Sequence, residues 1–97
     1  MMESFQKGVT RIAAGADIVT RRIQDEEVIL QLATGRYYGL DEIGTRSWEL
    51  LVQEQKLLAE AAEKLAEEYD APIPAIEADL IRLVEELYSS QLVGFAE

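Results

Sequence analysis

The sequence predicts an α+β fold, in which a three-stranded antiparallel β-meander is followed by three α-helices. Residues 18–40 are rich in β-branched and aromatic residues and are interrupted by polar or glycine-containing turns, which is typical of short strands. Residues 42–89 instead place apolar residues three and four positions apart, which is typical of amphipathic helices. No linker separates these halves, so we expect one domain over residues 1–97, with residues 1–8 flexible.

The first two predicted strands are residues 18–23 and 28–33. The first combines β-branched residues with arginines, and a polar break precedes the second. Along the second strand, alternate side chains point to opposite faces of the sheet. One of these faces is continuously apolar, and we expect it to contact the core. Its residues are Val28, Leu30 and Leu32.

The third predicted strand, Arg36 to Leu40, leaves one backbone edge of the meander without a partner. Thr34-Gly35 forms the tight turn before it, because glycine adopts the positive φ that hairpin turns require. Short connections make sequential strands antiparallel neighbours. The last strand then exposes a row of unpaired N–H and C=O groups, which is either protected or used for binding. We interpret this edge as the working surface of the protein.

Three helices are predicted after the meander. Asp41 is a suitable N-cap for the first helix, which follows it directly. The second covers Lys56 to Tyr69 and ends at a segment with two prolines, which cannot continue a helix interior. Pro74 suits the first turn of the third helix, where its missing N–H costs nothing, and this helix ends near Ser89. Residues 92–95 follow as an apolar tail folded back on the core.

The composition argues against catalysis. The chain has no histidine and no cysteine, so neither a Ser-His-Asp or Cys-His arrangement nor a zinc site of the usual kind can be assembled. A glycine-rich phosphate-binding loop is also missing from the sequence. We therefore expect a protein that is not an enzyme and that has no metal site and no cofactor.

The charge distribution argues against nucleic acid and membrane partners. Residues 1–53 hold 8 acidic and 6 basic side chains (net −2), and residues 54–97 hold 11 acidic and 3 basic ones (net −8). Nucleic acids and anionic membranes are bound through Lys and Arg, whereas this charge would attract a basic peptide or protein. The sequence has no apolar run of membrane-spanning length and no signal-peptide pattern, so we expect a cytoplasmic protein.

Three strands followed by three helices is the outline of a winged helix-turn-helix-like domain. In a DNA-binding member of this class, the recognition helix and the wing are basic. The third predicted helix has four acidic residues against one arginine. These residues are Glu77, Asp79, Glu85, Glu86 and Arg82. A DNA-binding winged-helix regulator is therefore the function class that the charge opposes most.

Several spaced residues together give the chain a family resemblance over roughly residues 9–95. The hairpin ends in a Gly-x-Tyr-Tyr-x-Leu pattern at residues 35–40, and Ser-Trp-Glu-Leu-Leu follows at residues 47–51. Leu65 and Tyr69 come four positions apart, Asp79 lies near the start of the third helix, and Leu87 and Leu92 close the pattern. The sequence resembles the PqqD-like family, and within it the stand-alone leader-recognition proteins of lasso peptide biosynthesis.

The resemblance implies that the protein binds the leader segment of a ribosomally synthesised precursor peptide. The leader would add a strand to residues 36–40 and lie in the groove between this strand and the third helix. The strand residues carried over are Arg36, Tyr37, Tyr38, Gly39 and Leu40. The helix residues carried over are Ile76, Asp79, Leu80, Leu83, Glu86 and Leu87. The sequence leaves open which of the helix residues face a groove and which face the core.

The resemblance also implies the partners and the chemistry of the groove. Lasso leaders offer a Tyr-x-x-Pro segment followed by a leucine, so apolar sockets are expected. Asp79, Glu86 and Glu77 would pair with basic leader side chains at the rim, where ion pairs contribute little affinity. The bound leader would be presented to a separate leader peptidase and to the macrocyclase.

A second interpretation within the same family is a peptide chaperone or activating subunit of a radical enzyme, as in pyrroloquinoline quinone biosynthesis. It differs from the first mainly in the partner, so this sequence leaves both open. The adjoining genes would separate them. A short precursor, a transglutaminase-like protease and an asparagine-synthetase-like cyclase indicate lasso assembly, whereas a radical enzyme indicates the other pathway.

Overall fold

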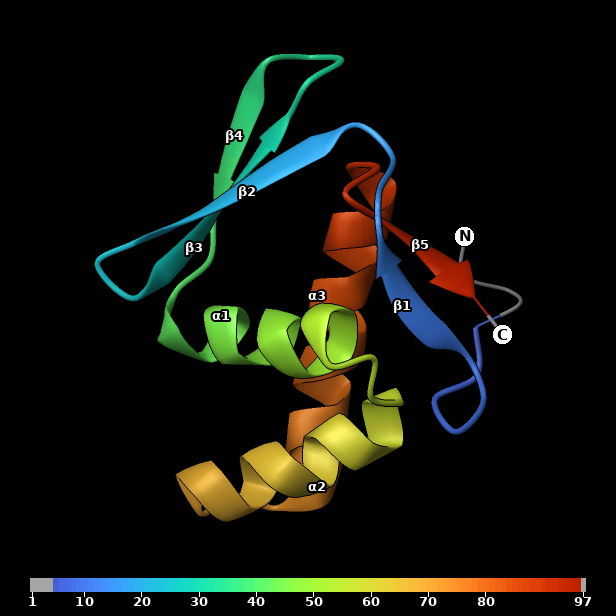
Figure 1. The fold of residues 1–97 in the computed structure, drawn as a ribbon. Helices are drawn as coiled ribbons and strands as arrows, with labels where there is room; N and C mark the ends of the chain where they lie inside the picture. Colours follow the sequence, from blue (N-terminus) through green and yellow to red (C-terminus); the bar gives the residue numbers. More distant parts are fainter. Residues whose placement is uncertain (1–4, 97) are drawn as a thin grey trace.

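The computed structural model describes residues 5–96 and confirms the α+β fold (Figure 1). Strands β2, β3 and β4 form the predicted antiparallel meander in that order, and the three predicted helices follow. A π-helical turn, η1, continues α1. The elements are β1 (Arg11–Ala14), β2 (Ile18–Ile23), β3 (Glu26–Gln31), β4 (Arg36–Gly39), α1 (Glu42–Trp48), η1 (Glu49–Gln53), α2 (Leu58–Tyr69), α3 (Ile73–Ser89) and β5 (Val93–Ala96).

A second, two-stranded sheet of β1 and β5 is absent from the sequence-based prediction. The predicted apolar tail folds back on the core, but as strand β5, which pairs antiparallel with β1 so that Ile12 lies opposite Phe95. Both strands have only four residues, too few for a clear alternation. Gly15 follows β1 where a side chain would not fit, because an added Cβ would lie 2.7 Å from the Gln91 carbonyl oxygen.

The start of the described chain contacts the C-terminal elements. The Phe5 ring centroid lies 5.3 Å from that of Phe95, and Lys7 Nζ lies 2.8 Å from Glu77 Oε1 on α3. These residues belong to the segment 1–8 that was expected to be flexible. Residues 1–4 of that segment lie outside the described residues.

Strand β3 turns the face opposite to the predicted one toward the core, so the prediction for Val28, Leu30 and Leu32 is wrong. Ile29 is fully buried, whereas Val28 and Leu30 are partly exposed and Leu32 is 56% exposed just after the strand. The inner face also contains Glu27 and Gln31, whose burial is offset by hydrogen bonds. Arg22 Nε donates to the Glu27 carboxylate (2.8 Å), and the Ala33 N–H donates to Gln31 Oε1 (2.7 Å).

The helices begin and end near the predicted residues. Asp41 is the N-cap of α1, and its side chain accepts a hydrogen bond from the Gly44 N–H (2.8 Å), as predicted. Helix α2 begins at Leu58, two residues later than predicted, after Gln55 adopts a left-handed conformation with φ 57°. Pro74 lies in the first turn of α3, as predicted.

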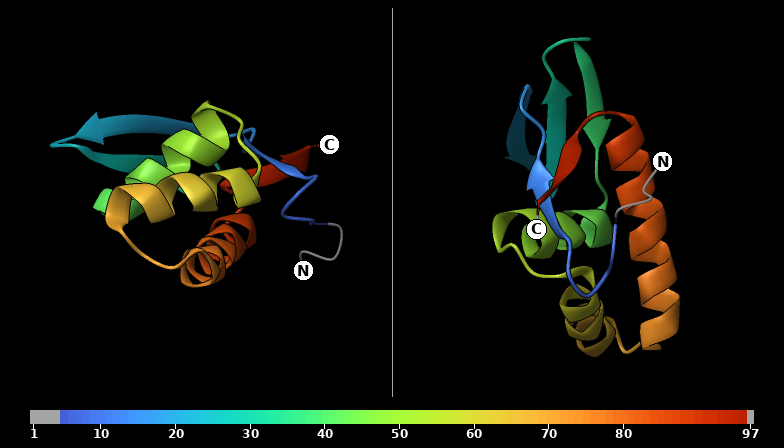
Figure 2. Two further views of the ribbon diagram at one scale, coloured as in Figure 1. Left: turned by 90° about the horizontal axis from the view of Figure 1, so that it is seen from below. Right: turned by 90° about the vertical axis from the view of Figure 1, so that its right-hand side faces the viewer.

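The core lies between the sheets and the helices. Trp48, Leu50, Leu51, Leu58 and Leu65 are buried in it. Figure 2 shows the three-stranded sheet projecting at one end of the molecule, with α2 at the other end and α3 running between them. Within the described part of the chain, no helix is both long and apolar enough to cross a membrane.

Candidate functional site

Strand β4 has one open edge in the three-stranded sheet. Its register with β3 places Tyr38 opposite Ile29 and Gly39 opposite Val28. The N–H of Leu40 donates to the Glu27 carbonyl oxygen (2.9 Å). Because hydrogen-bonded and non-hydrogen-bonded pairs alternate along an antiparallel ladder, the N–H and C=O groups of Tyr37 and Gly39 point away from β3. The open edge therefore offers the N–H and C=O groups of these two residues to an added strand.

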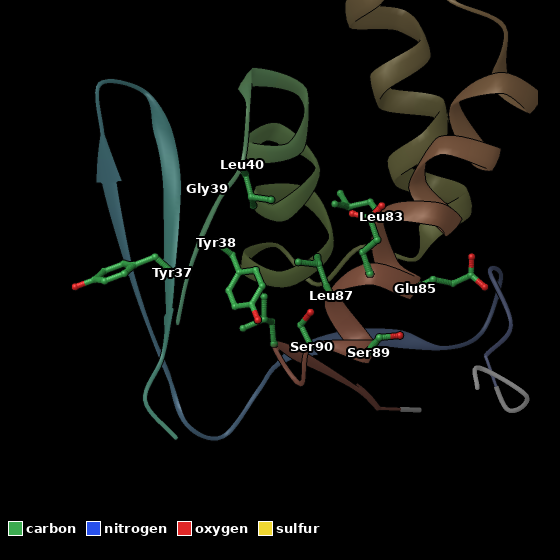
Figure 3. Close-up of a pocket in the computed structure, with 11 residues that line it drawn as sticks. Tyr37, Tyr38, Gly39, Leu40, Leu83, Glu85, Leu87, Ser89 and Ser90 are labelled. Atoms are coloured by element: carbon green, nitrogen blue, oxygen red, sulfur yellow. The ribbon is translucent and has the colours of Figure 1, made fainter. Parts of the chain in front are cut away.

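Helix α3 lies across from this edge and forms the second wall of a groove of about 680 Å³, here called the β4–α3 groove. The right-hand view of Figure 2 shows β4 beside the C-terminal half of α3. In Figure 3, Tyr38 points into the groove, whereas Tyr37 points to the opposite side of the strand. The lining residues are Tyr37, Tyr38, Gly39, Leu40, Leu83, Glu85, Glu86, Leu87, Ser89, Ser90 and Leu92.

A smaller hollow of about 290 Å³ continues along α3 toward its N-terminus, here called the α1–α3 hollow. Leu83 lines both cavities, so together they follow α3 from its C-cap, Ser90, back to Ile76. Helix α1 supplies the opposite wall. The lining residues are Asp41, Ile43, Gly44, Ser47, Leu65, Ile76, Asp79, Leu80 and Leu83.

The structure brings ten of the eleven residues predicted for the site to these two cavities. Tyr37, Tyr38, Gly39, Leu40, Glu86 and Leu87 line the β4–α3 groove; Ile76, Asp79 and Leu80 line the α1–α3 hollow; and Leu83 lines both. Arg36 lines neither cavity. Glu77, expected at the rim, is ion-paired with Lys7.

Sequence reasoning missed the contributions of α1 and of the turn after α3. Ile43 is 48% exposed beside the α1–α3 hollow. Glu85 shares the groove rim with Glu86. The two adjacent acidic residues in the sequence could have indicated that both lie at the rim. Ser89 and Ser90 enter the groove only because the chain turns there toward β5.

The site has an apolar floor and an acidic rim. Leu40, Leu80 and Leu87 are at most 8% exposed and belong to the core while lining the cavities. Glu85 and Glu86 are exposed at the rim, and Asp79 is ion-paired with Arg82. Among the described residues, no three His, Cys, Asp or Glu side chains are grouped so that they could hold a metal ion. This arrangement suits an extended peptide with apolar anchors and a basic side chain.

Four groups with shifted pKa values form an ion-pair network that lines neither cavity: Arg22, Arg46, Glu49 and Glu68. Burial opposes ionisation of Glu49, but hydrogen bonds from Arg22 and Arg46 lower its pKa overall. A hydrogen bond from Arg46 likewise lowers the pKa of Glu68 (Arg46 Nη2 to Glu68 Oε2, 2.7 Å). The network joins β2, η1, α1 and α2, so it helps to hold these elements, and through them the groove, in position.

Comparisons with known proteins give one family and two similar structures. The family model of coenzyme PQQ synthesis protein D (PqqD) matches residues 26–93. The structure of TbiB1 in complex with the TbiA(beta) leader peptide is 36% identical in sequence, and the match covers 88% of this chain and 99% of that chain with a TM-score of 0.79. No curated protein sequence matches the chain.

The second similar structure is lasso peptide synthetase B1 complexed with the leader peptide. It is 20% identical, and the match covers 87% of this chain and 98% of that chain with a TM-score of 0.80. At this identity the likeness shows the shared fold.

Proposed function

Because the chain belongs to the PqqD-like family of recognition elements for ribosomally synthesised and post-translationally modified peptides, we propose that it binds the leader segment of a lasso precursor peptide. The bound leader is presented to a separate leader peptidase and to the macrocyclase. The protein itself is not catalytic in this proposal. The observation that carries it is the open β4 edge beside an apolar groove with an acidic rim.

The leader adds a strand to β4 in this proposal. The outward-pointing N–H and C=O groups of Tyr37 and Gly39 form the hydrogen-bond ladder, which gives affinity without depending on the leader sequence. The 36% identity to TbiB1, whose structure is a complex with a leader peptide, supports a leader peptide as the ligand.

Sequence selectivity comes from the two cavities along α3. Apolar leader side chains occupy the β4–α3 groove over Leu40 and Leu87 and the α1–α3 hollow over Leu80. A complex of micromolar affinity requires about −8 kcal/mol, which the ladder and these anchors supply together. Glu85 and Glu86 set register and association rate by attracting a basic leader residue.

Isothermal titration calorimetry with the synthetic leader peptide encoded beside this gene tests the proposal. We expect one site with a dissociation constant of about 10 μM or lower. A peptide of the same composition in scrambled order is the matched control and should bind at least about tenfold more weakly. Equal affinity for both peptides, or no heat of binding with either, would contradict the proposal.

The match to coenzyme PQQ synthesis protein D favours one alternative, a peptide chaperone for a radical enzyme. Both functions use the same groove and differ in the enzyme that receives the peptide. A pull-down with purified enzymes from the gene neighbourhood separates them. Retention of a transglutaminase-like peptidase supports lasso assembly, whereas retention of a radical enzyme supports the alternative.

A further inference from the structure

The three-stranded sheet has an apolar face on the side away from the core, here called the outer sheet face. A hollow of about 360 Å³ lies on it, lined by Val19, Arg21, Ile23, Val28, Leu30 and Tyr37. Val19, Leu30 and Tyr37 form one cross-strand row, and Arg21, Val28 and Gly39 form the next. Because Gly39 has no side chain and nothing lies near its Cβ position, the second row is open at β4.

Three large apolar side chains of this face are at least half exposed. Val19 is 52%, Ile23 is 50% and Tyr37 is 71% exposed. Three of the seven large hydrophobic side chains that are exposed in residues 5–96 therefore gather on one face. Contiguous exposed apolar patches of this kind mark interaction sites, whereas scattered exposed hydrophobic residues need no explanation.

The charge of the outer sheet face differs from that of the rest of the protein. The chain has a net charge of −10, yet the hollow is lined by one basic residue, Arg21, and by no acidic residue. Arg21 has no ion pair with any residue from 5 to 96, in contrast to its neighbour Arg22, which pairs with Glu27 and Glu49. Glu26 lies at the end of the face, opposite Ile23 in the ladder. The complementary surface is therefore apolar and contains a carboxylate opposite Arg21.

We propose that the outer sheet face is the docking surface for the separate leader peptidase, which presents an apolar patch with a carboxylate that pairs with Arg21. This inference rests on the proposed function for the identity of the partner. A second copy of the chain fits less well, because a two-fold contact would bring two Arg21 guanidinium groups into one interface between two strongly acidic molecules.

The position of this face suits delivery of a bound peptide. Strand β4 belongs to both surfaces, and Tyr37 lines both the β4–α3 groove and the outer hollow. A leader added at the β4 edge would lie in the plane of the sheet, next to an enzyme docked on the outer face. The two surfaces do not overlap at Val19, Arg21 or Ile23, so docking and leader binding can be tested separately.

The test uses two outer-face variants, Val19→Glu and Arg21→Glu, with the full chain. Biolayer interferometry measures the affinity for the purified leader peptidase encoded with this protein, and calorimetry measures the affinity for the leader peptide. Val9→Glu is the matched control for Val19, since Val9 is 56% exposed and lines neither surface. Lys64→Glu on α2 is the control for the change of charge. Circular dichroism checks that each variant is folded.

We expect both outer-face variants to weaken peptidase binding at least about tenfold while leader affinity stays within about twofold of the wild type. The two control variants should keep both affinities. Peptidase binding that neither outer-face variant weakens would overturn the proposal. So would an outer face that binds only the cyclase, or a wild-type dimer that Val19→Glu dissociates. If the wild type binds the peptidase through this face but binds no leader, the proposed function fails and the docking surface stands.

Discussion

Tyr38 lies directly opposite the fully buried Ile29 in the β3–β4 ladder. This register places the Tyr38 side chain on the core side of the sheet, where it points into the β4–α3 groove, and turns Tyr37 to the outer sheet face (Figure 3). One four-residue strand thus serves two surfaces. Leader binding, as proposed, depends on the backbone edge of this strand before any of its side chains.

Gly39→Pro should weaken leader binding without unfolding the protein. The Gly39 N–H points to the open edge and has no partner in β3, so proline removes only the donor offered to the leader. Loss of one hydrogen bond, together with the ring at the edge, should weaken binding by about tenfold. Calorimetry measures the affinity. Gly39→Ala is the matched control and should bind like the wild type, because its Cβ meets open space. Equal weakening by both variants would show that the backbone donor is not the cause.

Leu83→Ala and Leu80→Ala should distinguish a residue that mainly binds the leader from one that mainly stabilises the core. Leu83 is half-buried and lines both cavities, whereas Leu80 is 3% exposed. We expect Leu80→Ala to lower the free energy of unfolding by about 2–4 kcal/mol, and Leu83→Ala by about 1 kcal/mol or less. Urea unfolding measures both values. Leu83→Ala should nevertheless weaken leader binding at least about fivefold. Wild-type affinity in this variant would remove Leu83 from the binding site.

Reversing the acidic rim should slow association more than it speeds dissociation. In the variant Glu85→Lys with Glu86→Lys, the rim repels the basic leader residue that it attracts in the wild type. We expect the association rate constant to fall by about two- to tenfold at low salt and the difference to shrink as salt screens the charges. Stopped-flow fluorescence at two salt concentrations measures this. Glu63→Lys on α2, outside both cavities, should leave the rate unchanged. A salt-independent difference would contradict an electrostatic role.

The Arg46–Glu68 ion pair should make stability depend on pH. The hydrogen bond from Arg46 lowers the pKa of Glu68 below its ordinary value of 4.5. The pair's contribution is therefore fully present above that value and is lost as the pH falls through the lower, folded-state pKa. At neutral pH we expect Glu68→Gln to lower the free energy of unfolding by about 0.3–1 kcal/mol, because the pair is partly exposed.

Urea unfolding at neutral pH and in acid checks the pH dependence. The difference between Glu68→Gln and the wild type should vanish in acid, where both side chains are neutral. Glu63→Gln, an exposed residue on the same helix, should show no difference at either pH. A penalty for Glu68→Gln that is the same at both pH values would mean that the carboxylate charge is not its source.

Local sequence signals predicted most of the elements but not the orientation of β3. Asp41 and Pro74 mark helix starts through their own backbone chemistry, so these predictions are confirmed. The face of β3 depends instead on tertiary partners, since Arg22 and Thr45 satisfy polar groups of Glu27 inside the protein. Val28 and Leu30 therefore lie on the outer face. The alternation pattern alone had placed these two apolar residues in the core.

The candidate site was predictable where it follows single elements. The free edge at residues 37–40 is evident from the order of the strands, whereas the α3 residues that line the cavities came from the family resemblance, because the helical stripe alone does not separate groove from core. The strand pair β1–β5 and the wall that α1 gives to the hollow depend on contacts between distant segments. No periodicity in the sequence reports such contacts.

The most direct test of leader binding at the β4 edge is an amide-resolved NMR titration of the full chain with the leader peptide encoded beside the gene. If the leader binds there, we expect saturable shifts confined to residues 36–40 and to the parts of α1 and α3 that line the two cavities, with slowed hydrogen exchange at the Tyr37 and Gly39 amides. The absence of shifts at high-micromolar peptide, or saturable shifts that avoid β4, would contradict leader binding at this edge.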